Sequence, residues 1–269
     1  MPKYSVHDIT RIGLSKRKLA ELVDSDIFSI TDVSEDFELS DNQRNQVNVA
    51  ISGKEIIDRD EIKDFLNIIQ YPISFLDYET YPSAIPRFHG YHPYDQIPFQ
   101  FSLHILEKPN GQLKHSEFIF SEKGNPDILF LDALNKMLPE KGSIVVWNKK
   151  FETTINKKLG ERNPDYSKIV SNINDRVVDL EDPFKFQYLV HPDFKGKTSI
   201  KYILPALVPK LSYKKLDIQE GGTASNTWNS IVKGEYSEDE TKKQIKNLKK
   251  YCELDTLAMV EIFNILKRI

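Results

Sequence analysis

Two carboxylates occupy a segment that otherwise has the composition of a buried strand. The apolar run Ile73–Leu76 leads directly into Asp77 and Glu79 in the stretch "FLDYET". In a strand successive side chains alternate between the two faces, so Asp77 and Glu79 point the same way. Adjacent carboxylates repel and raise each other's pKa unless a cation lies between them. The pair therefore indicates a site for a divalent metal.

Chance is the alternative explanation for this pair. The composition of 40 acidic residues in 269 gives about six acid-x-acid triplets, and the sequence has seven. The pair at 77 and 79 differs from the others because it follows an apolar strand, where burying unpaired charge is costly.

A third carboxylate, Glu152, lies where a strand is expected to end and a helix to begin. The stretch "VVWNKKFETTI" predicts a buried strand over 143–147 and places Asn148 at a helix N-cap. Asn148 and Glu152 are four residues apart, so they share a face of the helix, while Phe151 faces the core. The helix dipole also favours an acidic residue in the first turn, which is the alternative explanation for Glu152.

A fourth carboxylate, Asp255, belongs to the stretch "KKYCELDTLAMVEIF". Tyr251 and Asp255 are four residues apart on a predicted helix, so they project together. Asp255 lies beside an apolar stripe, where an unpaired Asp is unusual. A tyrosine on such a stripe is ordinary. The stripe comprises Leu248, Tyr251, Leu254, Ala258, Ile262 and Leu266.

The elements that must position these residues follow an α/β pattern. The Asn110-Gly111 pair predicts a hairpin between two of the strands, Asn125-Pro126 opens a helix, and Ser237 with Glu240 forms a capping-box pattern. The pattern predicts a mixed sheet, with three antiparallel strands and then parallel ones, flanked by helices on both faces. Strands are expected at 73–79, 97–106, 114–120, 143–147 and 176–180, and helices at 127–138, 151–162, 199–207 and from 238 to the C-terminus.

The chain is expected to divide near Tyr71-Pro72, into a small helical segment over 1–70 and an α/β domain over 71–269. The segment around Ile12-Gly13-Leu14 resembles a helix-hairpin-helix module, in which backbone N–H groups grip a phosphate. Lys16, Arg17 and Lys18 follow it. Because residues 1–70 hold 9 Lys/Arg against 14 Asp/Glu, a packing or linker role is the alternative.

Composition excludes several classes of protein. A 39% hydrophobic and 29% charged chain of 31.2 kDa is typical of a globular protein with a full core. The longest apolar runs have strand length, so we expect no membrane segment and no signal peptide. A single cysteine, Cys252, excludes internal disulfides and fits a cytoplasmic location.

The net charge of −3 does not indicate a nucleic-acid binder, although five lysines gather before Tyr251. They form either a solvated helix face or a rim that attracts phosphate. The five are Lys242, Lys243, Lys246, Lys249 and Lys250.

The three stretches "FLDYET", "VVWNKKFE" and "YCELD", in this order, resemble the motifs of DEDD 3′–5′ exonucleases of the ribonuclease H-like superfamily. That family has D-x-E on the first strand, N-x-x-x-D on a helix and, in its DEDDy branch, Y-x-x-x-D on the last helix. The resemblance covers residues 72–269. The stretches "YHPYDQIPFQFSLHIL", "RVVDLEDPF" and "TSIKYILPAL" resemble an uncharacterised bacterial branch, a domain of unknown function often found C-terminal to a Cas4-like nuclease in a longer chain.

The resemblance implies two Mg²⁺ or Mn²⁺ ions per site and hydrolysis of DNA or RNA from single-stranded 3′ ends. It implies Asp77, Glu79, Glu152 and Asp255 as metal ligands, with Tyr251 orienting the attacking water. Glu152 departs from the family pattern, which has Asp there, so its longer side chain would bind through an altered rotamer or through water. Asp179 is a spare candidate ligand, which we interpret as the cap of the following helix.

A long loop over 80–98 carries aromatic and basic residues that could contact nucleic acid. Packing of these aromatics within the protein is the alternative. Candidate contacts are Arg87, Phe88, His89, Tyr91, His92 and Tyr94 in the loop, with Asn148 and Lys201 elsewhere.

Two other functions stay open from the sequence. One is a catalytically weak or inactive ribonuclease H-like module that binds nucleic acid, which the Glu152 departure favours. The other is a structural or interaction domain whose acids only cap helices. Asp77, Glu79 and Asp255, present together, argue against both.

Overall fold

The computed structural model describes residues 2–269, which form two compact units. The sheet unit comprises residues 68–180 and 212–264, and the N-terminal unit comprises the residues up to 67 with 181–211 and 265–269. Over the described residues, no helix is both long enough and apolar enough to cross a membrane.

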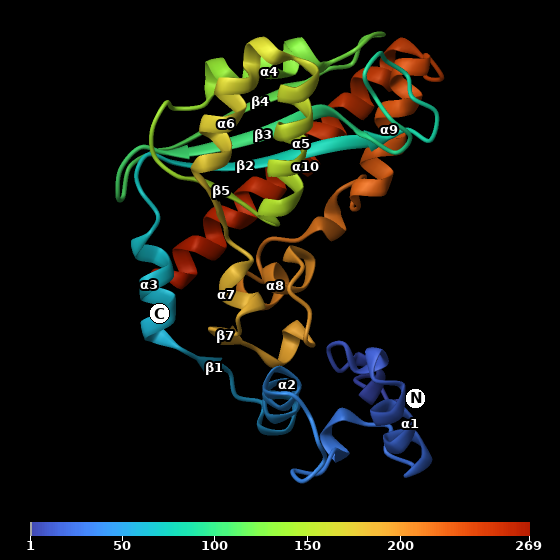
Figure 1. Ribbon diagram of the computed structural model, residues 1–269, viewed down its shortest axis with the longest axis vertical. Helices are drawn as coiled ribbons and strands as arrows, with labels where there is room; N and C mark the ends of the chain where they lie inside the picture. The colour runs from blue at the N-terminus through green and yellow to red at the C-terminus, as the bar shows by residue number, and fades with distance from the viewer. Residues whose placement is uncertain (1) are drawn as a thin grey trace. The chain divides into compact units, whose positions relative to one another are not determined.

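The sheet unit is built on a five-stranded mixed sheet with the order β4-β3-β2-β5-β6 (Figure 1). β2 pairs antiparallel with β3 and β3 antiparallel with β4, whereas β5 runs parallel to both β2 and β6. The predicted mixed α/β sheet is therefore confirmed. The strands are β2 (Ile73–Pro82), β3 (Gln96–Leu106), β4 (Leu113–Ile119), β5 (Ile144–Val146) and β6 (Val177–Asp179).

One face of the sheet carries the hydrophobic core of this unit. Leu76 and Tyr78 of β2 point to this face, where the ring of Tyr78 meets Phe130 edge-on at 5.2 Å. Burial of this apolar surface is the main stabilising contribution on this side. Three helices cover the face (Figure 1), namely α4 (Asp127–Met137), α5 (Lys149–Arg162) and α6 (Ser167–Asp175), with the 3₁₀ turn η4 (Pro164–Tyr166) before α6.

The opposite face is covered by the long helix α10 (Glu238–Leu266). Phe75 of β2 meets Phe263 of this helix edge-on at 5.6 Å, and Gln100 Nε2 donates to Leu248 O at 3.0 Å. The predicted start of the helix is also correct, since Glu240 N donates to Ser237 Oγ at 3.3 Å. Residues 75, 77 and 79 face α10, whereas 76 and 78 face the core.

The helix α9 (Gly221–Lys233) is an element that the sequence patterns do not predict. It packs against β2 at the end that follows Glu79, where Ser225 Oγ donates to Thr80 O at 2.8 Å. Its Trp228 is buried, stacks on Phe99 at 4.6 Å and donates to Phe120 O at 2.6 Å. Burial of a tryptophan with its N–H satisfied offsets the poor helix propensity of a start with two glycines. The 3₁₀ turn η6 (Tyr213–Lys215) precedes α9.

Gly142 sets β5 beside the start of β2. Its φ is +84°, and a Cβ there would lie 2.0 Å from Pro72 O, so only glycine fits this close approach. Ser143 N then donates to Gln70 O and Ser74 N donates to Ser143 O. These bonds align the two parallel strands whose carboxyl ends carry the candidate site.

The N-terminal unit has its own core, and its chain segments come from more than one part of the sequence. β1 (Ile56–Ile57) pairs antiparallel with β7 (Leu189–Val190), and Thr10 Oγ1 donates to Gly196 O at 2.7 Å. Residues 181–211 thus belong to the same unit as the N-terminal segment. The expected division near Tyr71-Pro72 had placed them in the α/β domain. The helices are α1 (Lys16–Asp24), α2 (Asp41–Ser52), α3 (Arg59–Asn67), α7 (Asp182–Lys185) and α8 (Ile200–Leu207), with 3₁₀ turns η1 (Val6–Asp8), η2 (Ile12–Leu14), η3 (Ile30–Asp32) and η5 (Pro192–Phe194).

The stretch that resembles a helix-hairpin-helix module forms η2 followed by α1. Arg17 and Lys18 both form ion pairs with Glu38, at 3.4 and 3.1 Å, while Lys16 is exposed. Leu14 is 83% exposed.

Candidate functional site

Asp77 and Glu79 lie on the same face of β2, as their spacing predicts. Their carboxylates and the Cys252 thiol of α10 offer ligand atoms that all lie within 4.8 Å of one another. The Cys252 Sγ is 3.7 Å from Asp77 Oδ2. Glu79 is buried and Asp77 is partly exposed, so part of the Asp77 side chain stays accessible to solvent.

Asp255 reaches the same place from α10. Burial, followed by the charge of Asp255, raises the pKa of the Asp77 carboxyl well above its usual value. The Tyr213 hydroxyl donates a hydrogen bond of 2.5 Å to Asp255 Oδ1. Both side chains are buried, so this bond fixes the orientation of the Asp255 carboxylate. Sequence reasoning missed Tyr213, because no local pattern around it indicates a partner 42 positions away.

Glu152 completes the cluster from the first turn of α5. Its side chain is only 2% exposed, and its Oε2 has no hydrogen-bond partner among the described residues. Burial, followed by the charges of Asp77 and Asp179, raises the pKa of the Glu152 carboxyl well above its usual value. A buried carboxylate oxygen without a partner is rare in folded proteins and needs an explanation.

Asp179, the spare candidate ligand, caps a helix, but not the one that follows it. Its two carboxylate oxygens accept hydrogen bonds of 3.0 Å from the backbone N–H groups of Asn148 and Lys149. It therefore caps the N-terminus of α5, and the N-cap of α7 is Glu181. The sequence interpretation was wrong because β5 and β6 are parallel neighbours, which brings the end of β6 to the start of α5. Asn148 occupies the N-cap position as expected, with φ +81°, but its side chain makes no capping bond.

Tyr251 lies among the carboxylates from the same helix as Asp255. Burial, followed by the charges of Asp255, Glu79 and Asp77, raises the pKa of its hydroxyl above the usual value. The hydroxyl therefore stays protonated at neutral pH and can donate a hydrogen bond. Its ring lies 6.0 Å from that of Tyr213.

The N-terminus of α9 adjoins Glu79. A Cβ built at Gly221 would lie 4.0 Å from Glu79 Oε2, which is ordinary van der Waals contact. The positive end of a helix dipole favours a negative charge at this position. Because α9 itself was not predicted, neither was this contribution to the site.

The donor set of the cluster suits a hard divalent cation. Four carboxylates from β2, α5 and α10 supply oxygen ligands, the type that Mg²⁺ and Mn²⁺ prefer. A cation between these carboxylates would give the unpartnered Oε2 of Glu152 a contact and would offset the burial and the repulsion that raise the pKa values of Asp77 and Glu152. The residues present therefore fit the metal that the resemblance implies.

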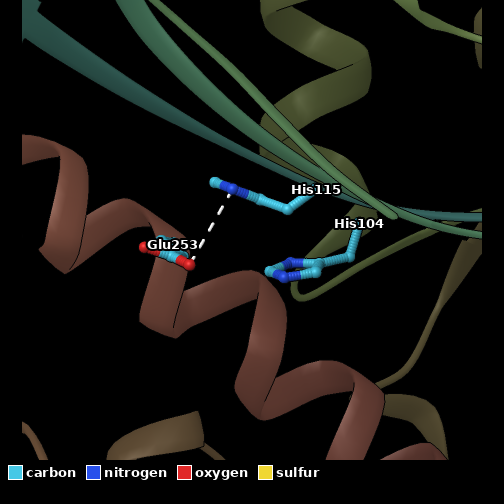
Figure 2. A group of neighbouring side chains, drawn as sticks. All are labelled: His104, His115 and Glu253. Carbon is cyan, nitrogen blue, oxygen red and sulfur yellow. Dashed lines mark ion pairs between the residues drawn. The ribbon is translucent and has the colours of Figure 1, made fainter. Parts of the chain in front are cut away.

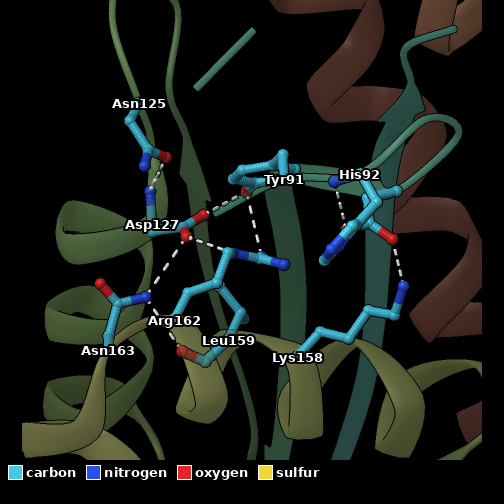
Figure 3. Close-up of polar contacts among 9 residues, drawn as sticks. Tyr91, His92, Asn125, Asp127, Lys158, Leu159, Arg162 and Asn163 are labelled. Carbon is cyan, nitrogen blue, oxygen red and sulfur yellow. Dashed lines mark hydrogen bonds and ion pairs between the residues drawn. The ribbon is translucent and has the colours of Figure 1, made fainter. Parts of the chain in front are cut away.

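Tyr91 does not have the role predicted for it in the aromatic loop. Its side chain is only 7% exposed, and its hydroxyl donates to Asp127 Oδ1 at 2.5 Å. Arg162 pairs with Asp127 Oδ2 at 3.0 Å and stacks over the Tyr91 ring at 3.8 Å (Figure 3). This ring is not accessible to a base, so the packing alternative holds for Tyr91. Lys158 holds the same loop through an ion pair with Asp95.

The other loop candidates have mixed environments. Arg87 is half-buried, donates to Asn229 and lies over the Tyr81 ring at 4.4 Å, while Phe88 packs edge-on against Tyr91. His89 is exposed, and the side chains of His92 and Tyr94 are 82% and 70% exposed.

Asn148 and Lys201 lie in different units. Asn148 lines an open pocket of about 300 Å³ together with Tyr94, Gln96 and Lys150. Lys201 belongs to α8 of the N-terminal unit.

The site and sheet together define an α/β protein with an acidic cluster at the carboxyl end of its first long strand. The family described as "Domain of unknown function (DUF2779)" matches residues 74–199, a range that includes Asp77, Glu79 and Glu152 and ends before Tyr251 and Asp255. No solved structure matches the chain.

Curated relatives come from mycoplasmas and a ureaplasma. "Uncharacterized protein MG366" of Mycoplasma genitalium is 28% identical over 226 residues, covering 75% of this chain and 33% of the relative. "Uncharacterized protein MG366 homolog" of Mycoplasma pneumoniae is 28% identical over 205 residues, 70% of this chain and 31% of the relative. "Uncharacterized protein UU173" of Ureaplasma parvum is 26% identical over 222 residues, 72% and 31% respectively. The chain thus spans about a third of the length of these relatives.

Proposed function

We propose that the sheet unit is a divalent-metal-dependent 3′–5′ exonuclease that hydrolyses phosphodiester bonds at single-stranded ends of DNA or RNA. The observation that carries the proposal is the convergence of four carboxylates, one of which, Glu152, keeps a buried oxygen without a hydrogen-bond partner among the described residues. An isolated structural role would leave that oxygen a net cost to stability.

The strand arrangement supports the same proposal. The strands have the order β4-β3-β2-β5-β6, and three antiparallel strands followed by two parallel ones agree with the mixed sheet that the resemblance to the ribonuclease H-like superfamily implies. The acid pair stands on the central strand β2, Glu152 follows β5, and Tyr251 with Asp255 stands on the last helix. This is the order of elements in which the resembling exonucleases carry their motifs.

The chain's residues would divide the chemical work. Asp77, Glu79 and Asp255 would hold two Mg²⁺ or Mn²⁺ ions, and Glu152 would contribute through its unpartnered oxygen, directly or through water. When bound, such ions activate water and stabilise charge on the phosphate and on the leaving 3′ oxygen.

Two tyrosines would position these groups. The protonated Tyr251 hydroxyl would orient the attacking water and is a poor base because its pKa is raised. Tyr213 would hold Asp255 in the orientation its ligand role requires.

The direct test incubates the protein with 5′-labelled single-stranded DNA and RNA oligonucleotides and Mn²⁺. We expect a ladder that shortens by single nucleotides from the 3′ end, a stall at a 3′-phosphate and indifference to a 5′ block. Asp255→Asn should abolish the ladder, while Asp165→Asn, an exposed aspartate of η4, should leave it unchanged.

Two results would count against this function. Cleavage of a circular single strand would identify an endonuclease. Binding of oligonucleotides without any product in Mn²⁺ would favour the second candidate, an inactive nucleic-acid-binding module, which the Glu at position 152 in place of Asp supports. The proposal also keeps a Cas4-like nuclease module as a candidate partner within a longer chain. The matched residues make up only 31% and 33% of two relatives, so these relatives carry long further segments.

A further inference from the structure

A second group of potential ligands lies on the α10 side of the sheet, apart from the acidic cluster. His104 of β3 and His115 of β4 are paired in register, and Glu253 approaches them from α10 (Figure 2). The imidazole centroids are 4.5 Å apart, and His115 Nδ1 lies 3.8 Å from Glu253 Oε1. One ligand atom from each residue lies within 4.8 Å of the other two.

Neighbouring hydroxyls determine which nitrogen of each histidine carries its proton. When the Thr256 hydroxyl donates to Glu253 O at 3.1 Å, Thr256 Oγ1 accepts from His104 Nδ1 at 2.8 Å and from Ser102 Oγ at 2.8 Å. Because the Ser102 proton is then used, Ser102 Oγ accepts from His115 Nε2 at 3.0 Å.

With these hydrogen bonds, each imidazole ring keeps one unprotonated nitrogen whose lone pair can bind a metal. In this arrangement His104 Nε2 and His115 Nδ1 are the unprotonated nitrogens, and His115 Nδ1 lies on the side of the Glu253 carboxylate. Histidines that bind metal show this arrangement, in which the other ring N–H donates to an oxygen that fixes the tautomer.

We propose that His104, His115 and Glu253 form a binding site for a borderline divalent transition metal of the Zn²⁺ class. Two imidazole nitrogens and one carboxylate oxygen, with water as the fourth ligand, are a donor set that such ions take up. The proposal does not depend on the acidic cluster being catalytic, and the two sites differ in kind, since oxygen ligands suit Mg²⁺ and imidazoles suit Zn²⁺.

Small side-chain movements bring the ligand atoms of His104, His115 and Glu253 to the spacing that one metal ion requires. Tetrahedral bonds of zinc to nitrogen and oxygen place ligand atoms about 3.3 Å apart, near the 3.8 Å already present between His115 and Glu253. The two ring planes are inclined by 31°, so His115 must turn about its Cβ–Cγ bond for the lone pairs to converge. His115 and Glu253 can both move, because their side chains are 25% and 47% exposed.

Burial keeps the His104 imidazole in its neutral form. His104 is 4% exposed, and this burial, followed by the neighbouring His115, lowers its pKa to about 4. His104 is therefore neutral at physiological pH, the form that binds a metal. A metal held here would join β3 and β4 to α10 in the turn that also carries Tyr251 and Asp255.

The test uses Co²⁺ as a spectroscopic substitute for Zn²⁺. Tetrahedral Co²⁺ with nitrogen ligands gives strong visible absorption, whereas Co²⁺ in an all-oxygen octahedral site absorbs weakly. We expect the intact chain to develop this absorption at one equivalent and to lose it when Zn²⁺ is added. Asp77→Asn should keep it, which separates this site from the acidic cluster.

Variants of the two exposed ligands avoid unfolding the protein. His115→Ala should abolish the absorption and Glu253→Gln should weaken Zn²⁺ binding at least tenfold by calorimetry, with unchanged circular dichroism. The matched controls are His89→Ala and Glu107→Gln, both at exposed positions. The proposal is overturned if Co²⁺ gives no tetrahedral band, if His115→Ala keeps the band, or if Zn²⁺ binds only at millimolar concentration.

Discussion

Replacing Asp77 by Asn should invert the stability order of mutant and wild type depending on whether metal is present. In the folded, metal-free protein the pKa of Asp77 is raised above its unfolded value by burial and by Asp255. A group with a raised pKa contributes its full share to the free energy of unfolding at pH values below its unfolded pKa. This contribution is lost as the pH rises through the folded pKa. At neutral pH, which lies above the unfolded pKa, the wild-type Asp77 therefore lowers the free energy of unfolding, and the amide removes that penalty.

The magnitude follows from linkage. Each unit by which the folded pKa is raised corresponds to about 1.4 kcal/mol. For a domain of this size 1 kcal/mol shifts Tm by about 2–4 °C. Asp77→Asn in EDTA should therefore melt about 3–6 °C above wild type for each such unit. Mn²⁺ at 100 times its Kd should stabilise wild type by about 2.7 kcal/mol and the variant far less, so the order reverses.

Differential scanning calorimetry at neutral pH, with EDTA and with a series of Mn²⁺ concentrations, measures both effects. Asp165→Asn is the control, and it should melt like wild type in both conditions. The reasoning is refuted if the metal-induced shift is the same in Asp77→Asn and wild type, or if the variant is the less stable protein in EDTA.

Three further outcomes follow from the described contacts. Tyr251→Phe keeps the ring but loses the hydroxyl, so single-turnover cleavage in saturating Mn²⁺ should fall by about 10²–10⁴-fold, less than for Asp255→Asn; a rate equal to wild type would make Tyr251 a packing residue. Tyr213→Phe should weaken Mn²⁺ binding by about 10–100-fold in calorimetry without unfolding the protein, and unchanged affinity would contradict a positioning role. Arg162→Met leaves its buried partner carboxylate unpaired and should lower the free energy of unfolding in urea by about 3–5 kcal/mol, whereas Lys157→Met at an exposed ion pair should change it by less than about 1 kcal/mol.

The local signals in the sequence were sufficient for most of the sheet. The apolar run that opens β2, the Asn110-Gly111 hairpin and the capping residue Ser237 act over a few neighbouring residues, so they can be recognised without the fold. The predicted strands accordingly match the five observed ones within a few residues. The same signals placed Asp77 and Glu79 on one face.

Features that depend on tertiary packing could not be predicted in this way. The helix α9 has a weak local pattern and is stabilised by the burial of Trp228 against Phe99. Asp179 was assigned to the wrong helix because strand order, not chain order, determines which helix start it meets. Tyr91 looked available for stacking because its partners, Asp127 and Arg162, come from separate helices.

The buried network of Tyr91, Asp127 and Arg162 has a consequence for how a nucleic acid would be received. A long surface loop ordinarily loses conformational entropy when a ligand orders it, and this loss weakens binding. Here the loop is already anchored to α4 and α5, by the hydrogen bond, ion pair and ring contact at Tyr91 and by the Lys158–Asp95 pair. The exposed Tyr94 and His92 therefore lie on a loop whose conformation is already fixed. A nucleic-acid end that fits this conformation would bind without the entropy cost of ordering the loop. An end that does not fit could not be accommodated by a change in the loop.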